Sequence, residues 1–175
     1  SMNVGYLSLN CARPPFDQRL VRQAIAAALD PVALVEWGMD SAFVPAAGLV
    51  PPGMAGHDPS RKPAAADLER ARRLLAEAGY PNGFTVTLAT QTRPRLYCTD
   101  PAKLAARIRE DLARISVSVR IEEQGMNVFA DTIKNRDYQM ALTGRVGDTG
   151  DADDFLQPMA RQPDNDQNYV SEDIA

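Results

Sequence analysis

Residues 84–144 decide the fold, and they read FTVTLATQTRPRLYCTDPAKLAARIREDLARISVSVRIEEQGMNVFADTIKNRDYQMALTG. Segments 84–90, 116–122 and 138–144 are short, β-branched and largely alternating, which predicts three strands. Two amphipathic segments lie between them and predict helices. The order strand, helix, strand, helix, strand is typical of an α/β unit with a largely parallel sheet and flanking helices.

Capping signals place the two helices of this unit. Asp100 followed by Pro101 predicts a helix start, because proline lacks an N–H that would have no partner in the first turn. The apolar face of this helix consists of Leu104, Ile108, Leu112 and Ile115. We expect Asn127 to cap the second helix, over residues 127–136.

The segment before this unit, residues 4–40, predicts one strand and two helices. Residues 4–10 alternate as a strand, Asp17 is the expected N-cap of the first helix, and Asp30 with Pro31 marks the start of the second. Trp37, near the end of that second helix, is expected in the core.

Residues 41–66 are rich in proline and glycine and predict a long loop wrapped over a surface. Asp67 then caps a helix that ends at Gly79, a position suited to left-handed backbone. Residues 67–160 therefore form the predicted α/β core, and residues 161–175 form a tail that follows it.

Composition and charge exclude several kinds of partner and chemistry. A net charge of −4 and a pI near 5.0 exclude broad binding to nucleic acid, which requires a basic surface. The single histidine, His57, lies in the Pro/Gly-rich loop without a nucleophile motif, so we expect no enzyme. Cys11 and Cys98 lack metal or redox spacing and could form a disulfide or remain two free thiols.

Two loops leave the predicted carboxyl ends of the strands, where ligands bind in open α/β sheets. One loop, QTRPRLYC at 91–98, is basic, and the other, GRVGDTGDADDF at 144–155, is acidic. The acidic loop partly mimics a calcium loop but lacks its central glycine and its glutamate at position twelve, so we expect no metal site. The aspartates at 151, 153 and 154 are suited to capping a short helix that follows.

The chain resembles the family 5 extracellular solute-binding proteins, which serve dipeptide, oligopeptide and nickel ABC importers. The resemblance rests on five ordered segments, GYLSLNCARPPFDQRLVRQAIAAALD, LVPPGM, DLERARRLLAEAGYPNGF, ARISVSVRIEE and GRVGDTGDADDFL. It implies one lobe of a periplasmic-binding-protein-like fold, with residues 1–175 forming a C-terminal-lobe fragment excised from a two-lobed parent. It also implies that the tail, residues 161–175, continues into that parent.

The resemblance also implies a function without cofactor or catalysis. The expected partners are a small-molecule or peptide ligand, the other lobe of the parent and an ABC permease in the membrane. The expected location is periplasmic or extracellular and membrane-associated, where a disulfide is permissible. An alternative is the ligand-sensing module of a bacterial transcriptional regulator that carries the same lobe.

The dipeptide-binding branch of the family implies roles for particular residues. By motif, Asp148 meets the ligand's amino group and Arg93 its carboxylate, with Arg95 as a substitute if the loop is shifted. Tyr97 in the same loop is a candidate for stacking on the ligand. Arg145 stands where peptide binders commonly have an aromatic residue, which favours a more acidic ligand or an ion pair with Asp148 or Asp151.

Overall fold

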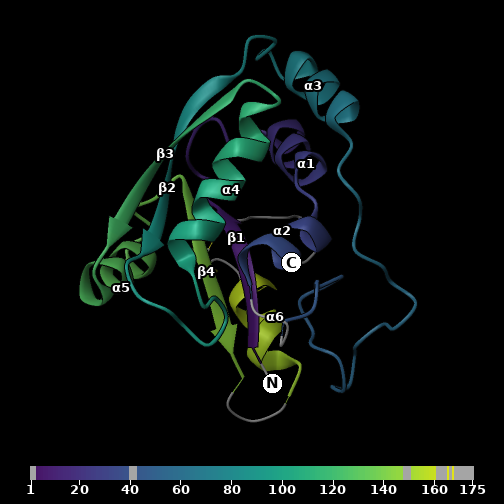
Figure 1. Ribbon diagram of the computed structural model, residues 1–175, viewed down its shortest axis with the longest axis vertical. Coiled ribbons are helices and arrows are strands. Elements are labelled where there is room, and N and C mark those ends of the chain that lie inside the picture. Colours follow the sequence, from purple (N-terminus) through teal and green to yellow (C-terminus); the bar gives the residue numbers. More distant parts are fainter. Residues whose placement is uncertain (1–2, 40–42, 148–150, 161–164, 166, 168–175) are drawn as a thin grey trace.

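The computed structural model describes residues 3–39, 43–147, 151–160, 165 and 167 (Figure 1). Its strands are β1 (Asn3–Leu9), β2 (Phe84–Gln91), β3 (Val117–Gln124) and β4 (Met140–Val146). Its helices are α1 (Arg19–Ala28), α2 (Pro31–Gly38), α3 (Leu68–Glu77), α4 (Pro101–Ala113), α5 (Met126–Lys134) and α6 (Asp153–Ala160). Residues 43–66 form neither helix nor strand.

The four strands form one sheet in the order β1-β4-β2-β3. Strand β2 runs parallel to both of its neighbours, β3 and β4, whereas β1 pairs antiparallel with β4 at the edge. The predicted α/β fold with a largely parallel sheet is therefore confirmed. The parallel strands β2, β3 and β4 all end at the same edge of the sheet, which we call the C-terminal edge.

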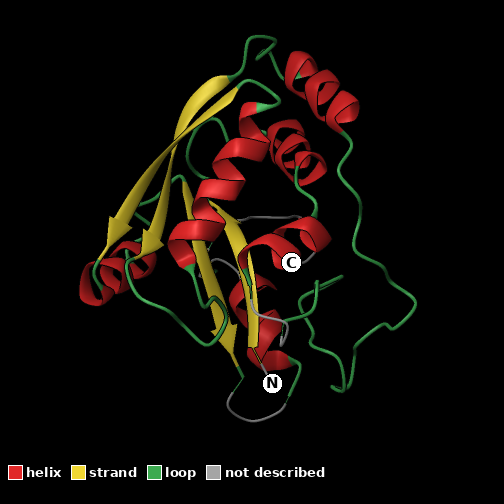
Figure 2. Ribbon diagram, in the orientation of Figure 1, coloured by secondary structure: helices red, strands yellow, loops and turns green. Residues whose placement is uncertain are grey.

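Helices cover both faces of the sheet (Figure 2). Helix α4 crosses β2 and β3 on one face, while α5 packs on the other face of β2 (Figure 1). The larger core, on the α4 face, is made by fully buried side chains such as Leu88, Ile108, Leu112, Val117 and Met140. The smaller core, on the α5 face, consists of Ala89, Phe129, Tyr138 and Ala141.

Three of the predicted aspartate caps are confirmed. The Asp30 carboxylate accepts hydrogen bonds from the Val32 and Ala33 N–H groups at 2.9 and 3.1 Å. Asp67 and Asp100 each accept one such bond at 2.9 Å in the first turns of α3 and α4. The expected left-handed stop is also present, since Gly79 has a φ of 89°.

Two cap predictions were wrong, the first by one residue and the second by two. Helix α1 begins at Arg19 with Gln18 at the N-cap, so Asp17 lies one position too early for its side chain to reach the free N–H groups. Helix α5 begins at Met126 with Gly125 at the N-cap, which places Asn127 inside the first turn. The Gln18 side chain forms no capping hydrogen bond, and Gly125 has no side chain that could form one.

Trp37 is not in the core, as the sequence suggested, but 50% exposed. The cationic groups of Lys103 and Arg107, one turn apart on α4, lie 5.7 and 5.5 Å from the centre of its ring. These cation–π contacts hold the ring against α4 while leaving much of its surface open.

The two cysteines are free thiols, Cys98 buried and Cys11 half-buried. Burial raises the pKa of the Cys98 thiol to about 11 and also raises that of Cys11. Of the two alternatives open from the sequence, the structure has the free thiols.

Candidate functional site

The C-terminal edge brings together the segments that follow β2 and β4. These strands share a parallel register, with Leu88 beside Met140 and Ala89 beside Ala141, so both run toward this edge side by side. The loop from β2 to α4 passes close to the end of β4 (Figure 1). The basic and acidic loops of the sequence therefore start from neighbouring strands.

Tyr97 fastens the loop after β2 to the sheet. Its ring packs so closely on Gly144 of β4 that a Cβ added there would lie 2.3 Å from the Tyr97 Cγ. A Cβ on Gly5 of β1 would likewise lie 2.8 Å from the Tyr97 carbonyl oxygen. The buried Gln91 amide donates a hydrogen bond to the Tyr97 hydroxyl at 2.9 Å. Tyr97 is only 8% exposed, so most of its ring is used for packing within the lobe.

Three arginines of the predicted site are exposed at this edge, Arg93 and Arg95 after β2 and Arg145 near the end of β4. The Arg95 Nη1 lies 3.6 Å from the Met126 sulfur, and the Arg145 Nε donates to the Asp154 carbonyl at 3.1 Å. With the residues that the structure describes, none of the three forms an ion pair. The three guanidinium groups therefore lie exposed at this edge, with no carboxylate of a described residue at ion-pair distance.

The acidic loop is described only in part. Asp148, the predicted partner of a ligand amino group, lies outside the described residues. The Asp151 carboxylate accepts a hydrogen bond from the Asp153 N–H at 3.1 Å, just before α6. Asp151 therefore acts in the turn that starts α6, as the pattern of aspartates suggested.

Exposed apolar side chains also lie in the segments that follow β2 and β3. The sequence patterns did not predict this exposure. Leu96 is 68% exposed, Met126 is 61% exposed and Val128 is 58% exposed. Met126 lies two residues after Gln124, the last residue of β3, so an apolar residue close to a strand end was the available signal. The Gln124 Oε1, at the end of β3, is buried without a hydrogen-bond partner among the described residues.

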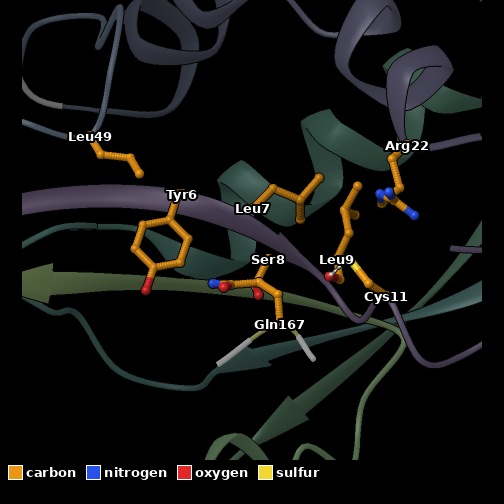
Figure 3. Close-up of a pocket in the computed structure, with 8 residues that line it drawn as sticks. All are labelled: Tyr6, Leu7, Ser8, Leu9, Cys11, Arg22, Leu49 and Gln167. Atoms are coloured by element: carbon orange, nitrogen blue, oxygen red, sulfur yellow. Dashed lines mark hydrogen bonds between the residues drawn. The ribbon is translucent and has the colours of Figure 1, made fainter. Parts of the chain in front are cut away.

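A separate hollow of about 320 Å³ lies along the outer side of β1 (Figure 3). Its lining includes Tyr6 to Leu9 of β1, with Leu49 and Gln167 approaching from other segments. The Gln167 carbonyl accepts a hydrogen bond from the Cys11 N–H at 2.7 Å, so Gln167 lies beside the residues that follow β1. The hollow includes none of the three arginines.

The part of the chain that the structure describes offers neither a cluster of metal ligands nor a membrane-spanning helix. There, no three histidine, cysteine, aspartate or glutamate side chains come together as a metal site would require. Within the same residues, every helix is too short or too polar to cross a membrane.

The family model of the bacterial extracellular solute-binding proteins, family 5 (middle), matches residues 1–167. The chain belongs to this family. The resemblance inferred from the sequence motifs is thereby confirmed.

Relatives of this family-5 chain include proteins named for different ligands. It is 33% identical over 155 residues to the dipeptide-binding protein of Escherichia coli K12, covering 89% of this chain. It is equally identical over 158 residues to heme-binding protein A of Haemophilus influenzae, covering 90% of this chain. In both cases the chain spans about 29% of the relative's length.

Solved structures agree with the family assignment. The dipeptide-binding protein from Pseudoalteromonas sp. SM9913 in complex with Met-Leu matches with a TM-score of 0.84 and 30% identity. HbpA2 from Haemophilus parasuis matches with a TM-score of 0.86 and 29% identity. Each comparison covers 98% of this family-5 chain and 35% of the solved chain.

Proposed function

We propose that this family-5 chain is the substrate-capture lobe of an ABC importer's solute-binding protein. It binds a small peptide-like or other small charged solute, without catalysis, in a cleft completed by the rest of the protein. The observation that carries the proposal is the set of exposed guanidinium groups at the C-terminal edge, free of ion pairs with described residues. The relatives named for dipeptide binding support the choice of ligand class.

Arg93 is proposed to bind the ligand's carboxylate and Asp148 its amino group. A planar guanidinium can hold a carboxylate through two parallel hydrogen bonds, which suits recognition of a peptide end. Pro94 fixes the backbone just after Arg93 and so restricts where that side chain can reach. Arg95 and Arg145 add positive charge around the same position, and Tyr97 holds the loop in place through Gly144.

Binding to this lobe alone would be weak. A hydrogen bond to a charged group contributes about 1.5–3 kcal/mol net, so two such anchors supply about 3–6 kcal/mol. A micromolar Kd requires about 8 kcal/mol. The other lobe must supply the difference by closing over the ligand through a hinge motion.

The full-length protein acts in the periplasm or at the outer cell surface, associated with the membrane. Closure of the two lobes around the ligand creates the surface that an ABC permease recognises.

Calorimetry on the full-length protein tests the binding roles. Met-Leu is compared with its C-terminal amide, which lacks the carboxylate, and with its N-acetyl form, which lacks the ammonium group. Arg93→Ala should weaken free Met-Leu binding by about 10- to 100-fold, because a charged hydrogen bond is lost, and should change amide binding little. Asp148→Asn should show the same pattern for free and N-acetyl peptide.

The matched control is Arg73→Ala, an exposed arginine on α3. Helix α3 lies at the opposite end of the molecule from the C-terminal edge (Figure 1). Affinity for every probe should be unchanged in this variant. Equal losses for free and amidated peptide in Arg93→Ala would reject a carboxylate contact, and the absence of binding to all charged small solutes would reject the proposed function.

A further inference from the structure

Strand β3 lies at the outer margin of the sheet and is paired on one side only (Figure 1). Among the described residues, the order β1-β4-β2-β3 leaves its second side without a strand. A groove of about 440 Å³ lies at the start of β3, lined by residues 116–119 and by Arg109, Glu110 and Ala113 of α4. An open strand edge is a template for pairing with another chain, because its backbone groups are unpaired.

The hydrogen bonds of β2 show which backbone groups of β3 point outward. The Gln124 carbonyl accepts a hydrogen bond from the Thr92 N–H at 3.1 Å, so the backbone groups of Gln124 point toward β2. Thr87 lies beside Arg120 in the parallel register and points away from β3, because its N–H donates to the Gln139 side chain at 3.0 Å. The direction alternates along each strand, so Arg120 also points toward β2 and its neighbours in β3 point outward.

The outward backbone groups belong to Val117, Val119, Ile121 and Glu123. In the part of the chain that the structure describes, their N–H and C=O groups on this side have no hydrogen-bond partner. They form a regular ladder of donors and acceptors that an antiparallel strand can match residue by residue.

The exposed charges of β3 indicate which strand fits this ladder. Arg120 and Glu122 lie on one face of the sheet, with side chains 73% and 43% exposed, and form an ion pair at 3.5 Å. If a second copy of β3 pairs antiparallel with Ile121 opposite Ile121 of the partner subunit, each Arg120 lies opposite Glu122 of the partner subunit. A shift by one step of the ladder in either direction sets Arg120 opposite Arg120 of the partner subunit, or Glu122 opposite Glu122 of the partner subunit. Like charges directly opposite are destabilising, so β3 complements itself best in the register centred on Ile121.

We propose that two copies of the protein associate through their β3 strands, in the antiparallel register centred on Ile121. The Ile121 pair and the two pairs of Val119 with Glu123 exchange about six backbone hydrogen bonds, two for each pair. Arg120 and Glu122 stand at the closely spaced positions between these pairs, where opposite side chains lie nearest. A single strand pair is smaller than the interface of a permanent dimer, so the association should be weak, with a Kd in the micromolar range or above.

This association leaves the proposed ligand site open. Antiparallel pairing turns the C-terminal edges of the two lobes in opposite directions, so neither copy covers the arginines after β2 of the other. Ligand affinity should therefore not depend on association, and a failure of this inference would leave the proposed function standing.

Sedimentation velocity of the full-length protein, over a concentration series that rises to near-millimolar, tests the association. Arg120→Glu and Glu122→Arg each set like charges opposite one another and should each weaken self-association about tenfold or more. An equimolar mixture of the two variants should associate like wild type, because one variant is then wholly acidic and the other wholly basic at these two positions. The mixture also shows that both variants fold. Arg73→Glu, the same charge change on α3 outside the sheet, should have no effect.

Hydrogen–deuterium exchange distinguishes strand pairing from a contact of charges alone. The amides of Val119, Ile121 and Glu123 should exchange more slowly as the protein concentration rises, whereas amides of the long loop at 43–66 should not change. A monomer at every concentration, variants that self-associate like wild type, a mixture that stays monomeric, or unchanged exchange at the three amides would each overturn the inference.

Discussion

Gly144→Ala should destabilise the lobe, because Gly144 packs against Tyr97 in the loop after β2 that carries Arg93 and Arg95. The added Cβ would lie 2.3 Å from the Tyr97 Cγ, 2.6 Å from its Cδ2 and 2.6 Å from the Val4 carbonyl oxygen. Favourable carbon contacts lie at about 3.5–4.0 Å, so the overlap with the ring exceeds about 1 Å. Moving the ring away would break the 2.9 Å hydrogen bond from Gln91 and expose a side chain that is now 8% exposed.

The expected cost is about 3 kcal/mol. Overpacking in a filled interior costs about 1–3 kcal/mol, and the lost hydrogen bond adds about 1 kcal/mol. Equilibrium urea unfolding followed by circular dichroism measures the change. In the control Gly48→Ala, the nearest atom to the new Cβ is the Arg61 Nη1 at 4.0 Å, so stability should change by less than about 0.5 kcal/mol. Equal stability of Gly144→Ala and wild type would refute the packing of Tyr97 on β4.

Three further predictions concern single side chains. Asp100→Ala should cost about 1 kcal/mol of unfolding free energy through the lost α4 cap, whereas Asp17→Ala should cost close to nothing; equal costs in urea unfolding would contradict this assignment. Thr90→Val should stabilise the lobe by about 1 kcal/mol, because the buried Thr90 hydroxyl has no partner among the described residues; a loss of stability would show that the hydroxyl is satisfied. The pKa of about 11 should make Cys98 alkylation at pH 8 about a hundredfold slower in the folded protein than in urea; rapid labelling of the folded protein would contradict the burial. Because the unfolded thiol ionises near pH 8.5 and the folded thiol does not, stability should also fall as pH rises from about 8.5 to 11, and Cys98→Ala should reduce that slope.

The fold was largely predictable because local signals and topology agree. Asp30, Asp67 and Asp100 each stand directly before an apolar helical face, so capping chemistry fixed three helix starts. The prediction of Asp17 as an N-cap was wrong, because α1 begins only at Arg19 and Gln18 takes the N-cap position. Asp17 follows the buried Phe16, in the segment that leads into the helix. The exposure of Trp37 was not readable from sequence, since it depends on Lys103 and Arg107 from another helix.

The candidate site was predictable in place but not in detail. The alternation of strands and helices placed the basic loop at the carboxyl ends of the strands, where the exposed Arg93 and Arg95 are found. The packing of Tyr97 on Gly144 joins residues far apart in the chain, so no local sequence pattern predicts it. The contact of Arg95 with Met126 is of the same kind and depends on the parallel pairing of β2 with β3.

A crystal structure of the full-length protein with Met-Leu would show directly whether Arg93 binds the ligand's carboxylate. The quantity to measure is the distance from the Arg93 guanidinium nitrogens to the oxygens of the ligand's carboxylate. Two contacts of about 2.7–2.9 Å, with the ligand enclosed between this lobe and the other, are the predicted result. A carboxylate bound away from the C-terminal edge, or Arg93 paired with an acidic side chain of the protein itself, would contradict the account.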